Sequence, residues 1–128
     1  MKKKHKKPSA YDKVPCILIC DAGKWRKWLE KNHLKKNKVG IILYKKHTGK
    51  PFITQREAMD EGICFGWIDT LIKRLDDKKF IRYFVRRGDK AMWSENTLRR
   101  AKCLLKAGRM SPVGILRYKE GLRKEKKR

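Results

Sequence analysis

The chain has 128 residues, the common size of one domain, so it can bury a core without disulfide or metal support. Lys and Arg number 37 against 13 Asp and Glu, and the formal net charge of +24 predicts attraction to polyanions such as nucleic acid. The longest apolar run is far shorter than the roughly 20 residues that cross a bilayer, so no transmembrane segment is expected. The basic start of the chain is not followed by an apolar signal-peptide core, so secretion is not expected either.

Charge alone does not identify the partner. An anionic component of the cell envelope or an acidic protein is an alternative to nucleic acid. A high Lys content also accompanies adaptation to a hot habitat without any binding role. The charge therefore predicts a class of partner, a polyanion, and leaves its identity open.

The cysteines indicate a reducing compartment. Cys16, Cys20, Cys64 and Cys103 stand among apolar neighbours and form no C-x-x-C pair. Free cysteine in such surroundings behaves as a small hydrophobe. We therefore expect reduced thiols, a cytoplasmic protein, and no metal ion or other cofactor.

The start of the chain predicts a disordered arm, then a strand and a helix. Residues 1–13 are rich in Lys and nearly free of apolar side chains, which is typical of a disordered basic arm. The apolar run over residues 14–20 predicts a buried strand. Asp21 is a suitable N-cap for a helix over residues 22–33, where two Trp and one Leu recur at helical spacing.

The next segment predicts a strand, a turn and a helix. Residues 39–44 contain β-branched side chains and predict a second strand, and residues 47–51 predict a turn. Thr54 and Glu57 have the spacing of a capping box, so a helix begins there. It is expected to end at one of the next two glycines, Gly62 or Gly66.

Residues 67–87 have the pattern of a β-hairpin. One strand rises over residues 67–72, polar residues 76–79 turn the chain, and residues 80–87 return. The returning segment also fits a helical period, so a helix over residues 80–87 is the alternative.

The remaining residues predict two helices and a tail. Ser94 can cap a helix that ends before Gly108, and Pro112 suits the first turn of another. Residues 125–128 form a basic tail. We therefore expect one α+β domain over residues 14–124, with a small mixed or antiparallel sheet of about four strands packed with about four helices.

Several segments resemble a known family. They are Trp28-Leu29-Glu30, Tyr44-Lys45-Lys46, Cys64-Phe65-Gly66-Trp67-Ile68-Asp69, Trp93-Ser94 and Gly108-Arg109-Met110. In order and spacing, they resemble the YdeI/OmpD-associated family, also called bacteriocin-protection proteins. The resemblance implies an intracellular protein linked to tolerance of antimicrobial peptides or envelope stress, with no established reaction. Family members continue into a further helical segment, so the chain is expected to correspond to the first-half domain alone.

A polar cluster around Asp69 is the first candidate binding site. The hypothesis is that it recognises a small anionic ligand or a protein partner. Alternatively, Asp69 pairs with an arginine and the tryptophans belong to the core, because large aromatic rings supply much of a small core's burial. The proposed ligand-binding residues are Lys45, Trp67, Asp69, Arg87, Trp93 and Ser94.

Two basic surfaces are candidates for polyanion binding. If residues 80–87 form a strand, Phe80, Arg82, Phe84 and Arg86 share a face that could stack bases and neutralise phosphates. The alternative is that helices bury both phenylalanines. The helix after Ser94 carries a second basic surface, opposite Leu98, Ala101 and Leu105, and the residues of this stripe are Arg99, Lys102, Lys106 and Arg109.

No pattern predicts catalysis. His5, His33 and His47 are not paired with a nucleophile, and the Gly49-Lys50 pair lacks the first glycine of a phosphate-binding loop. The first hypothesis is thus a non-enzymatic, basic, polyanion-binding domain. The second is a recognition module that uses Trp67 and Asp69.

Overall fold

The computed structural model describes residue 11 and residues 13–126, and these form an α+β fold. The sheet contains β1 (Cys16–Leu18), β2 (Lys38–Tyr44), β3 (Trp67–Arg74) and β4 (Lys79–Arg86). The strand order is β1-β2-β4-β3, in which β1 is parallel to β2 and the other pairs are antiparallel. The predicted α+β class is confirmed, the sheet is mixed, and the returning segment of the hairpin is a strand.

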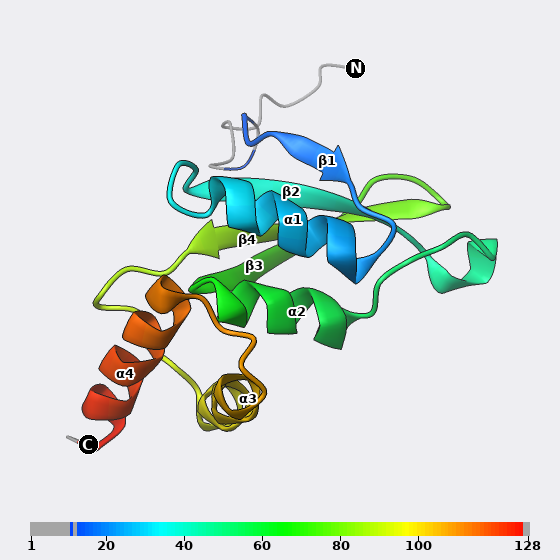
Figure 1. Cartoon of the computed structure of the whole chain (residues 1–128). Coiled ribbons are helices and arrows are strands. Elements are labelled where there is room, and N and C mark those ends of the chain that lie inside the picture. The colour runs from blue at the N-terminus through cyan, green and yellow to red at the C-terminus, as the bar shows by residue number, and fades with distance from the viewer. Residues whose placement is uncertain (1–10, 12, 127–128) are drawn as a thin grey trace.

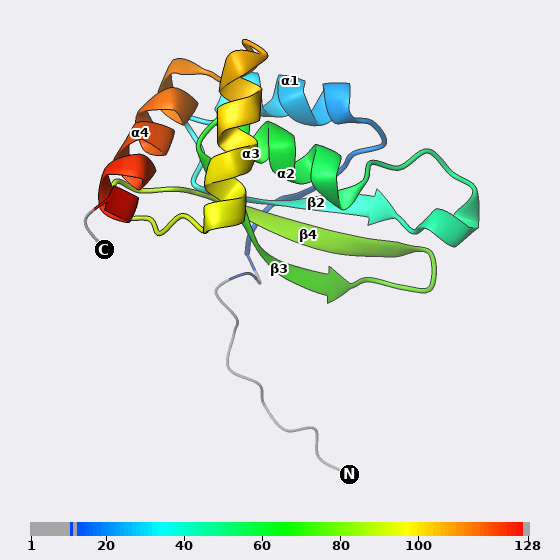
Figure 2. The same ribbon diagram turned by 90° about the horizontal axis from the view of Figure 1, so that it is seen from below.

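The helices form a layer against the sheet. They are α1 (Ala22–Asn32), α2 (Gln55–Cys64), α3 (Glu95–Lys106) and α4 (Pro112–Lys126), with a short 3-10 turn η1 (Lys46–Thr48). In Figure 1, α1 and α2 lie over the sheet, and Figure 2 shows α3 and α4 beside α2. Because α2 contacts α1, α3, α4 and β3, it is the central helix of the layer.

Capping side chains begin the helices where the sequence predicts. The Asp21 carboxylate accepts a hydrogen bond from the Lys24 amide at 2.8 Å at the start of α1. Thr54 and Glu57 form both bonds of a capping box at the start of α2. Ser94 caps α3 through its hydroxyl oxygen. These bonds satisfy amides that have no partner within their own helices.

The ends of the chain differ from the prediction. The strand expected over residues 14–20 is shorter, and α4 continues through position 125, where the basic tail was expected to begin. Most of the expected arm lies outside the described residues. Tyr11, however, donates a hydrogen bond to the Thr70 hydroxyl at 2.9 Å, and its ring lies 4.8 Å from that of Tyr83. The chain therefore contacts the sheet before residue 14.

The two faces of β4 are oriented opposite to what the base-stacking hypothesis predicts. Phe84 is fully buried beside its ladder partner Val39, and its ring lies 4.9 Å from that of Trp25 in α1. Phe80 packs against the same core. Because the apolar positions of β2 face the helices, the register places the phenylalanines there too. The prediction of a free face with Phe80 and Phe84 is wrong: Phe84 is fully buried, as the alternative supposed, and Phe80 is half-buried against the core.

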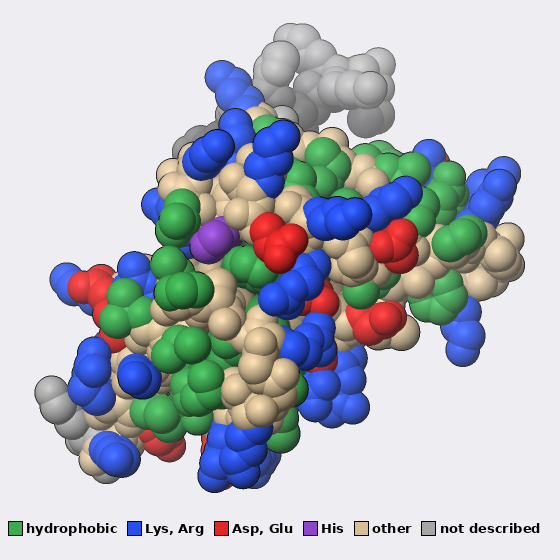
Figure 3. All heavy atoms as spheres, in the orientation of Figure 1, with side chains coloured by type: hydrophobic (Ala, Val, Ile, Leu, Met, Phe, Trp, Pro, Cys, Tyr) green, Lys and Arg blue, Asp and Glu red, His purple; other side chains and the backbone are tan. Residues whose placement is uncertain are grey.

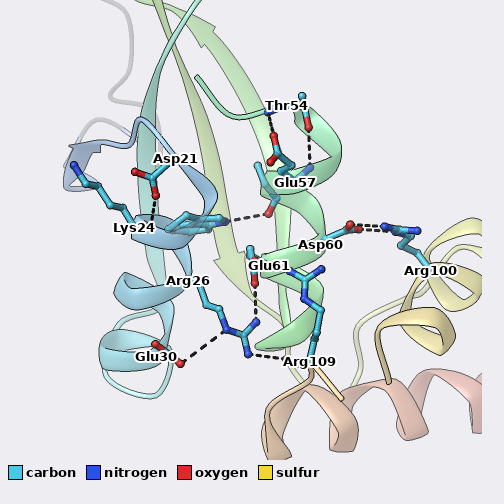
Figure 4. A network of polar contacts seen from close by, with 12 residues as sticks. Asp21, Lys24, Arg26, Glu30, Thr54, Glu57, Asp60, Glu61, Arg100 and Arg109 are labelled. Atoms are coloured by element: carbon cyan, nitrogen blue, oxygen red, sulfur yellow. Dashed lines mark hydrogen bonds and ion pairs between the residues drawn. The ribbon is translucent and has the colours of Figure 1, made fainter. Parts of the chain in front are cut away.

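Two buried carboxylates tie the other helices to α2 (Figure 4). Asp60 accepts two hydrogen bonds from Arg100 of α3, at 2.7 and 2.6 Å. Glu61 accepts one from Arg26 of α1 at 2.7 Å and one from Arg109, after α3, at 2.6 Å. A buried carboxylate must be paired and hydrogen-bonded to offset its lost hydration. These pairs therefore determine how α1 and α3 sit against α2.

Close backbone contact holds α4 against the end of α2. A β-carbon at Gly114 would lie only 2.1 Å from the Cys64 carbonyl oxygen. The Ser111 hydroxyl donates to that same carbonyl at 2.8 Å. Only glycine allows this approach, so α4 depends on Gly114 for its position.

Replacing Gly114 with Ala should destabilise the fold. The added methyl group meets backbone, which cannot move aside as a flexible side chain could, so α4 must shift; a loss of about 2 kcal/mol or more is expected from overpacking. Urea denaturation measures it. The control is Gly88→Ala, since nothing lies within 4 Å of a β-carbon there. Equal stability of the two variants would contradict the close packing of α4.

Replacing Glu61 with Gln should also destabilise the fold. The side-chain amide nitrogen of Gln cannot accept a hydrogen bond, so one of the two arginine guanidiniums would lose its acceptor. Arg26 and Arg109 are 30% and 42% exposed, so they rehydrate in part, and we expect a loss of about 2 to 3 kcal/mol. The control, Asp77→Asn, removes an 88% exposed carboxylate and should change stability by about 0.5 kcal/mol or less. Thermal unfolding that ranks the two variants in the opposite order would refute the role assigned to Glu61.

Candidate functional site

Three of the predicted ligand-binding residues converge on one recess. Trp67 and Asp69 of β3 and Arg87, just after β4, line a cavity of about 40 Å³ between the sheet and α2. The hairpin register explains this, because Trp67 is opposite the residue before Arg87. A space of this size holds one or two water-sized groups. The recess alone is therefore too small for an organic ligand.

Arg87 is a buried cation whose guanidinium is only partly bonded. One terminal nitrogen donates to the Met92 carbonyl at 3.1 Å, and the group lies 4.0 Å from the centre of the Trp93 ring. The Nε atom is buried and has no hydrogen-bond partner among the described residues. Burial lowers the pKa of Arg87 to about 10, and the Asp69 carboxylate acts in the opposite direction. Arg87 is still charged at neutral pH.

Asp69 is paired with an arginine, as the structural alternative supposed. Its carboxylate accepts a hydrogen bond from Arg82 at 3.0 Å, and Arg82 is buried. Arg86 is exposed, but it donates to the backbone carbonyls of His33 and Leu34. Arg82 thus cannot offer a free guanidinium to a phosphate, and it is removed from the candidate polyanion surface.

The other members of the predicted cluster have structural contacts. Trp67 is fully buried and donates from its ring to the His33 carbonyl at 3.3 Å. Trp93 is buried against α4, and Ser94 caps α3. Lys45 is at the other end of the sheet, where it donates to the Asp76 carbonyl at 3.0 Å. The prediction that Lys45 lies near Asp69 is therefore wrong, because β2 carries it to the turn of the hairpin.

The basic stripe on α3 is present, but one residue on its basic side and one on its apolar side differ from the prediction. Arg99, Lys102 and Lys106 are exposed, with Arg99 paired to the exposed Glu95 at 3.7 Å, whereas Arg109 is held by the buried Glu61. On the opposite side Leu98, Ala101 and Leu104 are buried. Leu105, expected in the core, is 36% exposed because Leu104 occupies that position. The stripe in solvent is therefore Arg99, Lys102 and Lys106, and we call these three residues the α3 stripe.

A groove of about 700 Å³ lies between α2 and α3. Its floor includes Met59 and Ile63, and its walls carry the Asp60–Arg100 pair. Sequence reasoning missed this groove and the buried carboxylates beside it. The available signal was the adjacent pair of acidic residues inside a short helix whose other side chains are largely apolar. The remaining lining residues are Thr54, Gln55, Arg56, Asn96, Thr97, Arg99 and Cys103.

Among the residues that the structure describes, the thiols and histidines form no reactive arrangement. Burial raises the pKa of the Cys64 thiol, which disfavours its reactive thiolate. His33 contacts the Leu29 carbonyl, and His47 stands exposed in η1. In the part of the chain that the structure describes, no three His, Cys, Asp or Glu side chains could together hold a metal ion. Within that part, every helix is too short or too polar to span a membrane.

The surface combines charge with scattered apolar side chains. In Figure 3, Lys and Arg side chains gather over α1 and near the ends of α3 and α4, with few acidic side chains among them. The exposed large apolar residues include Leu34, Leu105 and Leu116. The visible face is thus predominantly basic.

Comparison with known proteins gives one match. A family model described as Domain of unknown function (DUF8412) matches residues 17–117, which include the sheet except Cys16, together with α1, α2, α3 and the groove. No curated protein and no solved structure matches the chain. Since the match covers well over half of its length, the chain belongs to the family Domain of unknown function (DUF8412).

Proposed function

We propose that the protein binds nucleic acid through its phosphate backbone, without base-specific recognition, and that the α3 stripe is the contact surface. The observation that carries the proposal is the way the fold uses its charges. Among the described residues, arginine is the cation of every ion pair except that between Lys79 and Asp76. The carboxylates of Asp60 and Glu61 are buried and paired with arginines, whereas Lys102 and Lys106 of α3 are exposed.

The α3 stripe fits this use. Arg99, Lys102 and Lys106 follow one another at i, i+3 and i+7, and seven residues of helix rise about 10 Å. Double-stranded DNA carries one negative charge per roughly 1.7 Å of its axis, so the stripe spans several phosphates. Ammonium groups are strongly hydrated point charges that attract phosphate without reading bases.

The packing of α3 favours nucleic acid over a lipid surface. A helix that lies in a membrane interface inserts its apolar face among the lipids. The apolar face of α3, formed by Leu98, Ala101 and Leu104, is buried in the protein instead. α3 therefore presents charged side chains to solvent but has no free apolar face that could insert among lipids.

The proposal includes a cellular setting. The resemblance of the Cys64–Asp69 and Gly108–Met110 segments to YdeI/OmpD-associated proteins supports a cytoplasmic, non-enzymatic role in tolerance of antimicrobial peptides or envelope stress. Nucleic-acid binding is the molecular activity we assign to that role.

Affinity for a mixed-sequence oligonucleotide should fall steeply between about 50 and 200 mM salt. Lys102→Gln with Lys106→Gln should flatten the logarithmic salt slope by about two units, since each lost phosphate contact contributes about 0.9. The matched control is Lys24→Gln with Lys27→Gln, which removes the same charge from the exposed side of α1. Fluorescence anisotropy across a salt series measures both variants.

Two outcomes would overturn this assignment. If the α1 control flattens the slope as much as the α3 variant, binding follows net charge and α3 is not the contact surface. If vesicles of anionic lipid bind more tightly than the oligonucleotide at the same salt concentration, the partner is a membrane surface.

A further inference from the structure

The groove between α2 and α3 has the size and composition of a small-molecule site. Its volume of about 700 Å³ lies within the range of about 300 to 1,000 Å³ that is usual for ligand pockets. Met59 and Ile63 supply an apolar floor, and arginines and small polar side chains supply the walls. This combination suits a ligand with an apolar body and a polar headgroup.

The charge of the groove is positive. The only carboxylate on its walls, that of Asp60, is buried and neutralised by two hydrogen bonds from Arg100. Arg56 and Arg99 also line the groove and are exposed to solvent, and the Arg99 guanidinium lies 3.7 Å from the exposed Glu95 carboxylate. Guanidinium groups recognise carboxylate and phosphate oxygens with paired hydrogen bonds. The headgroup that complements these walls is therefore an oxyanion.

The inner recess extends the groove toward a cation that lacks a full set of partners. Met59, Ile63 and Thr97 line both the groove and the recess, so the two spaces adjoin. Arg87 lines the recess, is only 4% exposed, and keeps a buried Nε without a hydrogen-bond partner among the described residues. Buried polar groups in native proteins are nearly always bonded, so such an atom points to a bound group or an ordered water.

We infer that the groove between α2 and α3 binds a small organic oxyanion, with its apolar body against Met59 and Ile63 and its carboxylate or phosphate group near Arg56 and Arg99. The recess at Arg87 lies beyond the groove floor and takes a small polar substituent of the ligand or a water that bridges to it. This site shares Arg99 with the proposed nucleic-acid surface, whereas Lys102 and Lys106 do not line the groove.

Two cysteines provide a direct test on the full chain. Cys103 lines the groove and is exposed, whereas Cys16 is exposed on β1 and does not line the groove. Alkylation of both thiols by iodoacetamide is followed by mass spectrometry in the presence of phenyl phosphate, benzoate or neutral benzamide. Phenyl phosphate or benzoate should slow the labelling of Cys103 severalfold, leave Cys16 unchanged, and act more strongly than benzamide. The more effective anion identifies the headgroup.

Arginine variants test the assigned contacts. Arg56→Gln should raise the anion concentration needed for half protection about tenfold or more, because a charge-assisted hydrogen bond is lost. Lys50→Gln removes the same charge from an exposed position that does not line the groove, and should leave protection unchanged.

Three results would overturn the inference. They are no protection of Cys103 by either anion, equal protection of Cys103 and Cys16, and equal protection by benzamide and benzoate. If Lys50→Gln weakened the protection of Cys103 as much as Arg56→Gln does, the protection would depend on net charge alone, and the inference would be overturned as well.

Discussion

The burial of two adjacent carboxylates on α2 is the constraint on which the rest of the structure depends. Asp60 and Glu61 have lost most of their contact with water, and a carboxylate in that position is tolerated only with paired, well-aligned donors. Arginines of α1, of α3 and of the segment before α4 provide them. The central helix is therefore held by charge on two sides, and its apolar side chains pack on the sheet. The Asp60–Arg100 pair also forms part of the wall of the groove between α2 and α3.

The same constraint divides the charges between the inside and the outside of the protein. Arginine makes planar, paired hydrogen bonds and is weakly hydrated, so it serves the buried carboxylates, whereas lysine stays in water. The chain has 37 Lys and Arg against 13 Asp and Glu, and two of these carboxylates are buried, so basic side chains outnumber acidic ones on the surface (Figure 3). The unpaired surface charge remains available for a polyanion.

Local signals in the sequence predicted much of the fold. Caps at Asp21, Thr54 and Ser94 and the polar turn of the β3–β4 hairpin depend on nearby residues, so they could be recognised without tertiary contacts. The faces of β4 could not, because Tyr83 and Phe84 are both buried and only the register with β2 decides which one meets the helices.

The candidate site was predictable only in part, for the same reason. Trp67, Asp69 and Arg87 converge because a hairpin brings them together, and a hairpin is visible in the sequence. The pairing of Glu61 with Arg26 and Arg109 joins residues far apart in the chain, and no local pattern specifies it. Lys45 was misplaced because the antiparallel register of β2 with β4 carries it to the hairpin turn, at the opposite end of the sheet from Asp69. The groove depends on the crossing of two helices, which sequence periodicity does not give.

The most direct test of the account is an amide chemical-shift titration of the isotope-labelled full chain with a mixed-sequence single-stranded oligonucleotide. If α3 is the phosphate-binding surface, the largest chemical-shift changes fall within residues 95–106 and disappear at high salt. Shifts concentrated on α1 or on the β3–β4 hairpin, with α3 unchanged, would contradict it.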